Sequence, residues 1–330
     1  SNQSQNLTHQ GLVKVINGGI IENALYGIRT IKVVQDETDG EYLDYHYTGG
    51  IVQAVDAGFI NNRNAVVFYD YALTSSSGFT GCDFITDNNY PGTSNPDYFV
   101  RLNSMRGISF VNCNFQNNSS TALNGSGIYA FNSGFTVRGK CTTQEEPCPE
   151  GDWDYGEFVD LKRGIYATSG GTVYYPEIHH NNFTGNHRGV YFSAMDYGEI
   201  TYNNFTTGPN IDGASYGLYL DGSTGYLVEE NNFIEGTADA IGIIVNRSGG
   251  EPNRIYRNYF TGLKFGIIAQ NNNRSVEGTG LELKCNTYDE MQWDKVVLYD
   301  GPFGNPEMGI ASNQGAAGSD PENMAGNLFD

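Results

Sequence analysis

Four tyrosines recur within the same short phrase of the sequence and are the first candidates for binding chemistry. They stand in GIY, GIY, GVY and GLY, as Tyr129, Tyr166, Tyr191 and Tyr219. Strand alternation would turn the aliphatic residue inward and the tyrosine outward, and stacked strands would align the tyrosines at intervals of about 4.8 Å. Arg163 and Arg188 precede two of them. Such a row could bind a sugar chain, and the alternative is that the stacked rings only stabilise a parallel sheet.

Two acidic clusters are candidates for binding Ca²⁺. The first contains Asp36, Asp39 and Glu41, and the second contains Asp152, Asp154, Glu157 and Asp160. Oxygen-rich loops suit this cation. Neither cluster matches the twelve-residue loop of helix-loop-helix Ca²⁺ proteins, so a solvated acidic face is the alternative, without any cofactor.

Three histidines lie close together in the sequence, His179, His180 and His187. The residues that follow each inward apolar position are mostly polar, which predicts that His179 and His180 face solvent at a bend. No cysteine or carboxylate stands at ligand spacing from them, so we expect a structural role at the surface and no metal site.

Glycoside hydrolysis needs two or more carboxylates on one face. The positions two residues beyond the tyrosine row are Phe131, Thr168, Ser193, Asp221, Asn246 and Gln270. Only Asp221 among them could act as a base. The chain contains neither Asp-Asp nor Gly-His-Gly, the signature of the polygalacturonases. For a lyase, Arg163 and Arg188 would be the basic pair in register.

A repeat must position all of these residues. Its anchor is an aromatic residue, at Phe84, Phe115, Phe183, Phe205, Phe233, Phe260 and Tyr288. Two positions earlier the later repeats have Asn181, Asn203, Asn231, Asn258 and Asn286, and the earlier ones have Cys82 and Cys113. Five positions before the anchor every repeat has an apolar residue. Each repeat therefore holds two short strand patterns that cannot form a core alone.

Stacked coils would give these repeats a common core. We predict an all-β, single-stranded right-handed parallel β-helix with loop insertions, since parallel crossovers are right-handed in about 98% of cases. The five asparagines should stack at one corner as an asparagine ladder, where asparagine tolerates a left-handed backbone and bonds to its neighbours. An α-solenoid is excluded, because helical spacing is absent and Gly, Asn and Tyr are poor helix formers.

Composition limits the partners. The 330 residues carry 38 acidic and 18 basic side chains, a formal charge of −20, which disfavours nucleic acid. No run reaches the roughly 18 apolar residues of a transmembrane helix. The chain starts without Met or a signal-peptide core, so we expect a mature part of a longer protein. Cys141 and Cys148 flank TTQEEP and should pair if the protein is exported, whereas Cys82 and Cys113 should be inward and reduced.

Several phrases resemble known families. The repeated asparagine phrase resembles the pectate-lyase-like and NosD-like right-handed β-helices. ENALYGI at 22–28, the GIY and NNF phrases, GLELKCNTY at 280–288 and GIASNQG with AGNLF within 309–329 resemble large secreted substrates of the type IX secretion system. This resemblance spans the chain and implies a secreted or extracellular cell-surface location. As partners we expect polysaccharide or secretion and surface proteins.

We expect residues 1–310 to form one solenoid and residues 311–330 a tail or linker. Insertions are predicted at 35–49, 86–99, 132–162 and 207–215. The leading functional hypothesis is a non-catalytic secreted or cell-surface module, a spacer or adhesin that contacts glycans or a partner protein. The alternative is a polysaccharide lyase or glycoside hydrolase that acts on an acidic polysaccharide.

Overall fold

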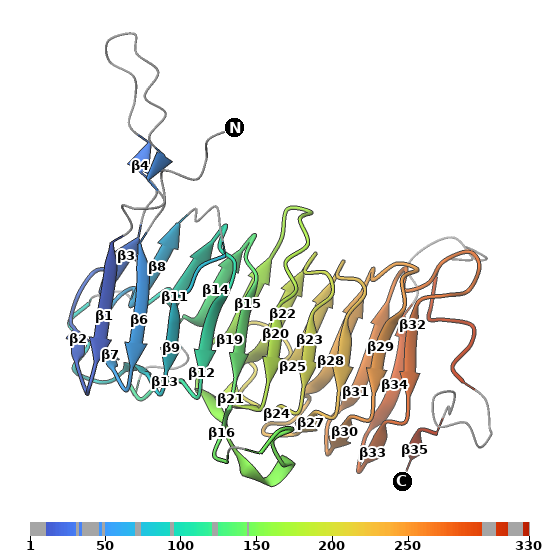
Figure 1. Ribbon diagram of the computed structural model, residues 1–330. Coiled ribbons are helices and arrows are strands. Elements are labelled where there is room, and N and C mark those ends of the chain that lie inside the picture. Colours follow the sequence, from blue (N-terminus) through green and yellow to red (C-terminus); the bar gives the residue numbers. More distant parts are fainter. Residues whose placement is uncertain are drawn as a thin grey trace.

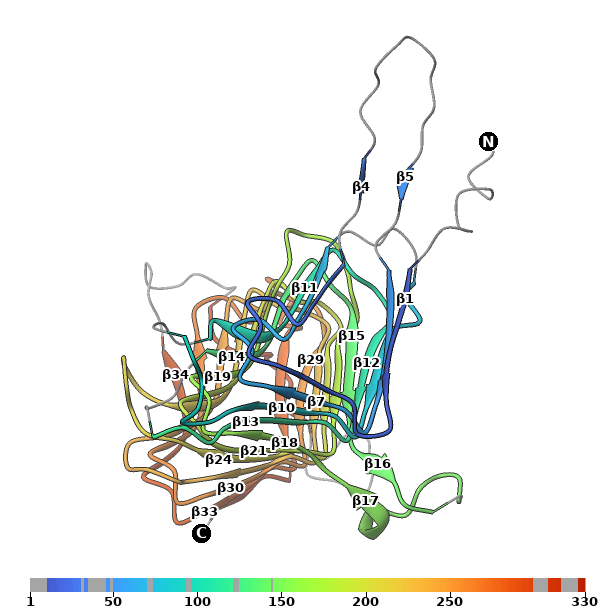
Figure 2. The same cartoon turned by 90° about the vertical axis from the view of Figure 1, so that its left-hand side faces the viewer.

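The chain winds into a right-handed parallel β-helix, each coil of which adds one strand to each of three long parallel sheets (Figure 1). The computed structural model describes residues 11–30, 33–34, 46–47, 50–69, 74–92, 96–120, 125–143, 145–298, 308–315 and 326–329. Viewed along the axis, the three sheets enclose a narrow core (Figure 2). The predicted fold class is confirmed.

The strands of the three sheets follow one another in every coil. The first sheet contains β1 (Leu12–Ile16), β6 (Ile51–Val55), β9 (Gly78–Thr80), β12 (Ile108–Val111), β15 (Phe135–Arg138), β20 (Glu177–His179), β23 (Glu199–Thr201), β26 (Leu227–Glu229), β29 (Asn253–Tyr256) and β32 (Leu281–Lys284). The second contains β2 (Ile20–Glu22), β7 (Gly58–Ile60), β10 (Asp83–Thr86), β13 (Asn114–Asn117), β18 (Gly156–Val159), β21 (Asn181–Asn186), β24 (Asn204–Thr207), β27 (Asn232–Ile234), β30 (Tyr259–Thr261), β33 (Thr287–Asp289) and β35 (Leu328–Phe329). The third contains β3 (Ile28–Thr30), β8 (Val66–Tyr69), β11 (Tyr98–Asn103), β14 (Ser126–Phe131), β19 (Arg163–Thr168), β22 (Arg188–Ser193), β25 (Tyr216–Asp221), β28 (Ile241–Asn246), β31 (Phe265–Gln270) and β34 (Trp293–Leu298).

The five predicted asparagines lie at the corner between the first and second sheets and are buried. Each side-chain amide donates to the carbonyl oxygen of the next asparagine, over 3.1, 3.0, 3.0 and 3.1 Å from Asn181 to Asn286. Each of these oxygens also accepts the backbone N–H of the previous asparagine. The ladder therefore satisfies buried polar groups along the axis.

The left-handed residue of this corner is one position earlier than we expected. It is His180, Tyr202, Glu230, Arg257 and Cys285 that have φ between 54° and 55°. The asparagine that follows is already turned into the core, because only there can its amide reach the next coil. This corrects the prediction that the asparagine itself takes the left-handed conformation.

The aromatic anchors form a continuous stack inside the second sheet. From Phe59 to Phe329 neighbouring rings are nearly parallel, with centroids 4.6 to 5.3 Å apart. The stack also explains the glycine of the GIY phrase. A Cβ on Gly164 would lie 2.8 Å from the Phe183 ring, so a side chain there has no room.

The two early cysteines occupy the ladder position of their coils and are buried free thiols. The Cys82 Sγ lies 3.5 Å from the Thr80 carbonyl, and the Cys113 Sγ lies 3.6 Å from that of Val111. The amide of Asn203 donates to the equivalent carbonyl, that of Thr201. A thiol thus replaces the asparagine amide as a weaker donor.

Two of the predicted insertions, 132–162 and 86–99, are shorter than predicted. Within 132–162, β15 and β18 belong to the regular sheets, and only 139–155 leaves the coil, with β16 (Lys140–Cys141), the 3₁₀ turn Glu150–Asp152 and β17 (Trp153–Asp154). Cys141 and Cys148 form a disulfide within it. The insertion at 86–99 ends before β11, which starts at Tyr98. Of 35–49, only the backbone of β5 (His46–Tyr47), paired with β4 (Val33–Val34), lies within the described residues.

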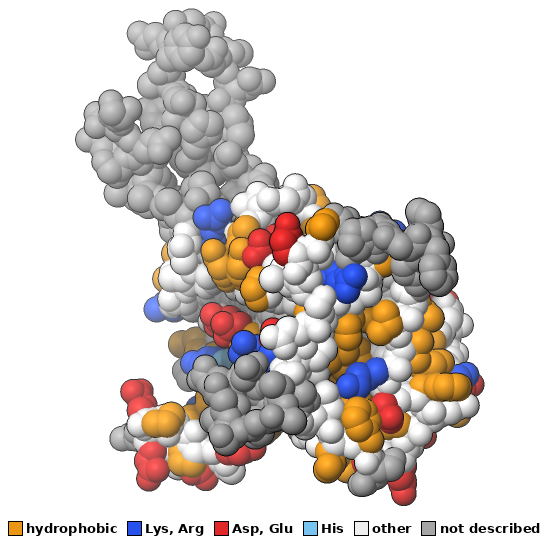
Figure 3. Space-filling view, turned by 90° about the vertical axis from the view of Figure 1, so that its right-hand side faces the viewer, with side chains coloured by type: hydrophobic (Ala, Val, Ile, Leu, Met, Phe, Trp, Pro, Cys, Tyr) orange, Lys and Arg blue, Asp and Glu red, His pale blue; other side chains and the backbone are white. Residues whose placement is uncertain are grey.

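The C-terminal end of the solenoid presents hydrophobic side chains (Figure 3), including Trp293, Val297 and Leu298. Within the predicted tail, β35 pairs with β33, and the side-chain oxygen of Asn327 accepts the backbone N–H of Asn286 at 3.1 Å. The described residues 326–329 therefore extend both the second sheet and the ladder.

Candidate functional site: the outer face of the third sheet

The four predicted tyrosines lie in one row on the outer side of the third sheet. Tyr129, Tyr166, Tyr191 and Tyr219 pair in register across β14, β19, β22 and β25. The aliphatic residue before each one is fully buried in the core. Parallel strands thus bring residues from four coils together, with one tyrosine about every 4.8 Å.

The faces of these tyrosine rings pack against one another. The centroids of Tyr129 and Tyr166 are 5.4 Å apart and those of Tyr166 and Tyr191 are 4.9 Å apart, with the planes within 12° of parallel. Tyr219 meets Tyr191 edge to face, at 71°. A stack of this kind offers ring edges and hydroxyl groups to a ligand, whereas sugar stacking would need open ring faces.

Three arginines lie among the tyrosines. The Arg163 guanidinium is 4.9 Å from the Tyr166 ring centre, and that of Arg188 is 5.7 Å from Tyr216. Arg101 lies 5.4 to 5.7 Å from three tyrosine rings and pairs in register with Tyr129. A hydrogen bond with Tyr98 raises the pKa of Arg101. Sequence reasoning missed Arg101, because its coil lacks the glycine phrase.

Asp212 neutralises one end of this row. Its carboxylate lies 2.7 Å from His187 Nε2, 3.0 Å from the Arg188 guanidinium and 3.0 Å from the Lys162 ammonium. The hydrogen bond from Lys162, followed by that from His187, lowers the pKa of Asp212 to about 2. Asp212 belongs to the turn between β24 and β25. This segment does not repeat along the chain, so the position of Asp212 could not be predicted from the period of the repeat.

Arg101 and Arg163 differ from Arg188, because neither has a carboxylate within ion-pair distance in the described part of the chain. We define the tyrosine–arginine face as Tyr98, Arg101, Asn103, Ser126, Tyr129, Phe131, Arg163, Tyr166, Thr168, Arg188, Tyr191 and Ser193, which are in register across β11, β14, β19 and β22. None of these twelve residues is acidic. In a chain with a formal charge of −20, this face is a local concentration of positive charge.

The predicted base Asp221 lies at the far edge of this face, on β25. It accepts hydrogen bonds from the Tyr191 hydroxyl at 3.2 Å and from the Asn246 amide at 2.7 Å. Burial, followed by the charge of Asp221, raises the pKa of Tyr191 to about 12. The row two positions beyond the tyrosines, from Phe131 to Ser193, adds no second carboxylate.

Those acidic residues proposed for Ca²⁺ that the structure describes do not form a cation site. Asp36 and Asp39 lie outside the described residues. Glu157 is on β18 and accepts from the Asn182 amide at 2.7 Å, whereas Asp152 and Asp154 are in the insertion. Nowhere in the described ranges do three His, Cys, Asp or Glu residues converge in a way that could hold a metal ion.

Two of the three histidines, His180 and His187, are buried, which corrects the prediction that they lie at the surface, whereas His179 is partly exposed. His187 is fully buried, with Nδ1 2.9 Å from the Pro209 carbonyl oxygen. His180 is at the expected bend but is buried, because Trp153 of the insertion stacks on it at 4.0 Å. The Nδ1 atoms of His179 and His180 are 3.0 Å apart, so in the neutral pair one ring donates to the other.

This histidine pair predicts a pH dependence of stability. Burial, followed by a neighbouring positive charge, lowers the pKa of both His179 and His180 to about 4. The unfolded chain, with ordinary values near 6.5, then binds more protons, so stability is complete above about pH 6.5 and falls as the pH drops toward 4. We expect the melting temperature of a His179→Gln, His180→Gln double variant to fall less than that of the wild type between pH 7 and 4. Equal slopes would contradict this account.

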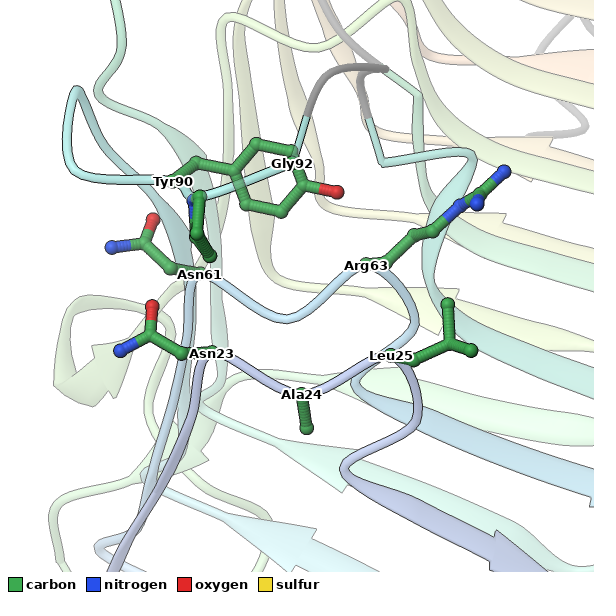
Figure 4. A pocket seen from close by; sticks show the side chains of 8 residues that line it. Asn23, Ala24, Leu25, Asn61, Arg63, Tyr90 and Gly92 are labelled. Carbon is green, nitrogen blue, oxygen red and sulfur yellow. The ribbon is translucent and has the colours of Figure 1, made fainter.

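A separate pocket of about 230 Å³ lies at the corner between the second and third sheets near the N-terminal coils (Figure 4). Two corner asparagines, Asn23 and Asn61, line it with Tyr90 and Arg63. Asn61 is held by Asp87, through amide-to-carboxylate and backbone bonds of 2.8 and 2.9 Å. The pocket lies away from the tyrosine–arginine face, and its side chains stabilise the turn.

Comparison with known proteins gives one family match. The family model described as NosD, periplasmic copper-binding protein, matches residues 153–291, which is less than half of the chain. This range runs from β17 of the insertion to just beyond β33. No curated protein and no solved structure matches the chain. Among the described residues, no helix is long and apolar enough to cross a membrane.

Proposed function

We propose that this chain is an extracytoplasmic β-helix module that binds a linear acidic glycan along the tyrosine–arginine face. The observation that carries the proposal is the pair Arg101 and Arg163, two guanidinium groups without carboxylate partners among the described residues of a strongly acidic chain. Charged groups on a surface are favourable where a ligand of opposite charge arrives.

The spacing of the face supports a chain-like ligand. Arg101 on β11 and Arg163 on β19 are two coils apart, roughly 10 Å along the solenoid axis, and they are offset by three residues, about another 10 Å, along the strands. Between them β14 contributes Tyr129, and no acidic side chain interrupts the row. A polymer with a carboxylate on each sugar can place one of these on each guanidinium, which binds carboxylates in a bidentate manner. Tyrosine hydroxyls can then bond to sugar hydroxyls.

The location and the non-catalytic role belong to the proposal. The periplasmic description of the matched family and the disulfide support a place outside the cytoplasm. Transport by the type IX secretion system stays a proposal from the sequence resemblance. Copper, which the family description names, has no place in our proposal, because no group of three His, Cys, Asp or Glu residues that could hold a metal ion is found among the described residues.

The test is equilibrium binding of oligogalacturonate and oligomannuronate. We expect binding that weakens as ionic strength rises, and an Arg101→Ala, Arg163→Ala double variant that binds at least about tenfold more weakly. Arg254→Ala is the matched control, because it removes a cation from the first sheet and should not change the affinity. Equal affinity of the double variant and the wild type would overturn the proposal.

The same samples test the enzymatic alternative. Release of unsaturated or reducing ends from either polymer, lost in an Asp221→Ala or Arg188→Ala variant, would replace the binding role by catalysis. We expect no release, because glycoside cleavage requires a partner acid for Asp221.

A further inference from the structure

A second recess lies at the corner between the third and first sheets, away from the tyrosine–arginine face. Its volume is about 200 Å³, and Arg106, Gly107, Gly134, Thr136, Tyr174 and Tyr175 line it. Drug-sized ligands occupy pockets of about 300–1,000 Å³, so this recess has room for a single sugar ring rather than for a larger group.

One column of corner residues creates this recess. The strand registers place Gly107, Gly134, Tyr175, Tyr197 and Gly225 at equivalent positions of five successive coils. A Cβ on Gly107 would lie 2.5 Å from Thr74, and one on Gly134 would collide with the Tyr174 carbonyl oxygen. Two coils of the column therefore cannot carry a side chain, and the next coil places the aromatic ring of Tyr175 beside them.

Tyr175 is an exposed tyrosine, and one face of its ring is open. Tyr175 is 63% exposed, and the following coil places Tyr197 on one side of it, at 5.7 Å between ring centres. The recess is on the side of the preceding coils. Both tyrosines have positive φ, 45° and 56°, a conformation that glycine adopts at the same position as Gly225, with φ 67°. Tyrosine is thus present where the backbone alone favours glycine.

The polar rim is balanced in charge. The Arg106 guanidinium lies 5.4 Å from the Tyr174 ring centre, and the Thr136 hydroxyl donates to the Glu177 carboxylate at 3.3 Å. One cation, one carboxylate and one hydroxyl suit a ligand with many hydroxyl groups and no net charge. An open aromatic face beside such groups suits the apolar face of a sugar ring.

We infer that this corner is a second binding site, which takes a neutral pyranose ring of a glycan. The ring would stack on Tyr175, with its hydroxyl groups on Arg106, Thr136 and Glu177. The site does not depend on the acidic glycan proposed for the third sheet, because it shares none of its residues and its rim has no net charge to attract an anion.

The test is titration with four neutral tetrasaccharides, namely cellotetraose, chitotetraose, mannotetraose and β-1,4-galactotetraose, followed by calorimetry. We expect at least one to bind, and Tyr175→Gly to weaken that binding about tenfold. This variant keeps the backbone conformation that the corner needs, so its melting temperature should match that of the wild type. Thr136→Trp, which fills the recess from an outward strand position, should also abolish binding.

Two controls separate this site from the other. Tyr259→Ala removes an exposed tyrosine from the second sheet, and the Arg101→Ala, Arg163→Ala double variant removes the proposed acidic-glycan site. Both should bind the neutral tetrasaccharide as the wild type does. The inference is overturned if none of the four binds, if Tyr175→Gly binds equally well, or if the arginine double variant loses the neutral ligand.

Discussion

Replacement of Phe205 by alanine is expected to lower the free energy of unfolding by about 3–5 kcal/mol. The ring is buried and stacks between Phe183 and Phe233, with centroids 4.7 and 4.8 Å away. Its removal leaves a void in the middle of the aromatic stack, and the regular coils on both sides hold the backbone apart, so the void cannot close easily. Urea denaturation followed by circular dichroism measures the change.

Ile234→Ala is the matched control for this substitution. Ile234 lies on β27, in the same sheet, but its side chain is outward and 39% exposed. We expect a change of less than about 1 kcal/mol. Similar losses for the two variants would show that the aromatic stack is not the main source of stability in these coils.

Replacement of Asn231 by leucine should cost a similar amount, about 3–5 kcal/mol, for a different reason. The Asn231 amide donates to the carbonyl oxygens of Ile200 and Glu229 at 2.8 and 3.0 Å. The amide also donates to Asn258, and the side-chain oxygen accepts from Asn203. Leucine has a similar volume but leaves several buried partners unsatisfied, at roughly 1–3 kcal/mol each.

The neighbouring residue provides the control for the ladder. Asn232 is outward and makes a single side-chain bond to Asn204, at 2.8 Å. Asn232→Leu is expected to change the free energy of unfolding by no more than about 0.5 kcal/mol. If Asn231→Leu were as mild, the ladder would be a consequence of the fold rather than a contributor to its stability.

The repeat made the core predictable, because each coil places the same residue type at the same phase. Asn231 and Phe205 could be assigned to the ladder and the stack since each has equivalents one coil away. The left-handed residue of the corner could not be assigned in this way, because His180, Tyr202 and Glu230 share no side-chain chemistry and only their backbone is alike.

The candidate site was predictable only where it coincides with the repeat. Tyr166 and Arg163 follow from the repeated GIY phrase. Arg101 is in register with the tyrosine of that phrase, but its own coil lacks the phrase. Asp212 and Trp153 belong to segments that depart from the coil, and they determine the charge near Arg188 and the burial of His180. Sequence periodicity carries no information about such contacts, because they depend on how an insertion folds back onto the solenoid.

The most direct test of the account is a crystal structure of the protein with an acidic oligosaccharide such as octagalacturonate. We predict that the sugar chain lies along the third sheet, with carboxylates within hydrogen-bond distance of the Arg101 and Arg163 guanidinium groups and hydroxyl contacts to Tyr129 or Tyr166. A structure in which the oligosaccharide is bound elsewhere, with both guanidinium groups free, would contradict the central claim.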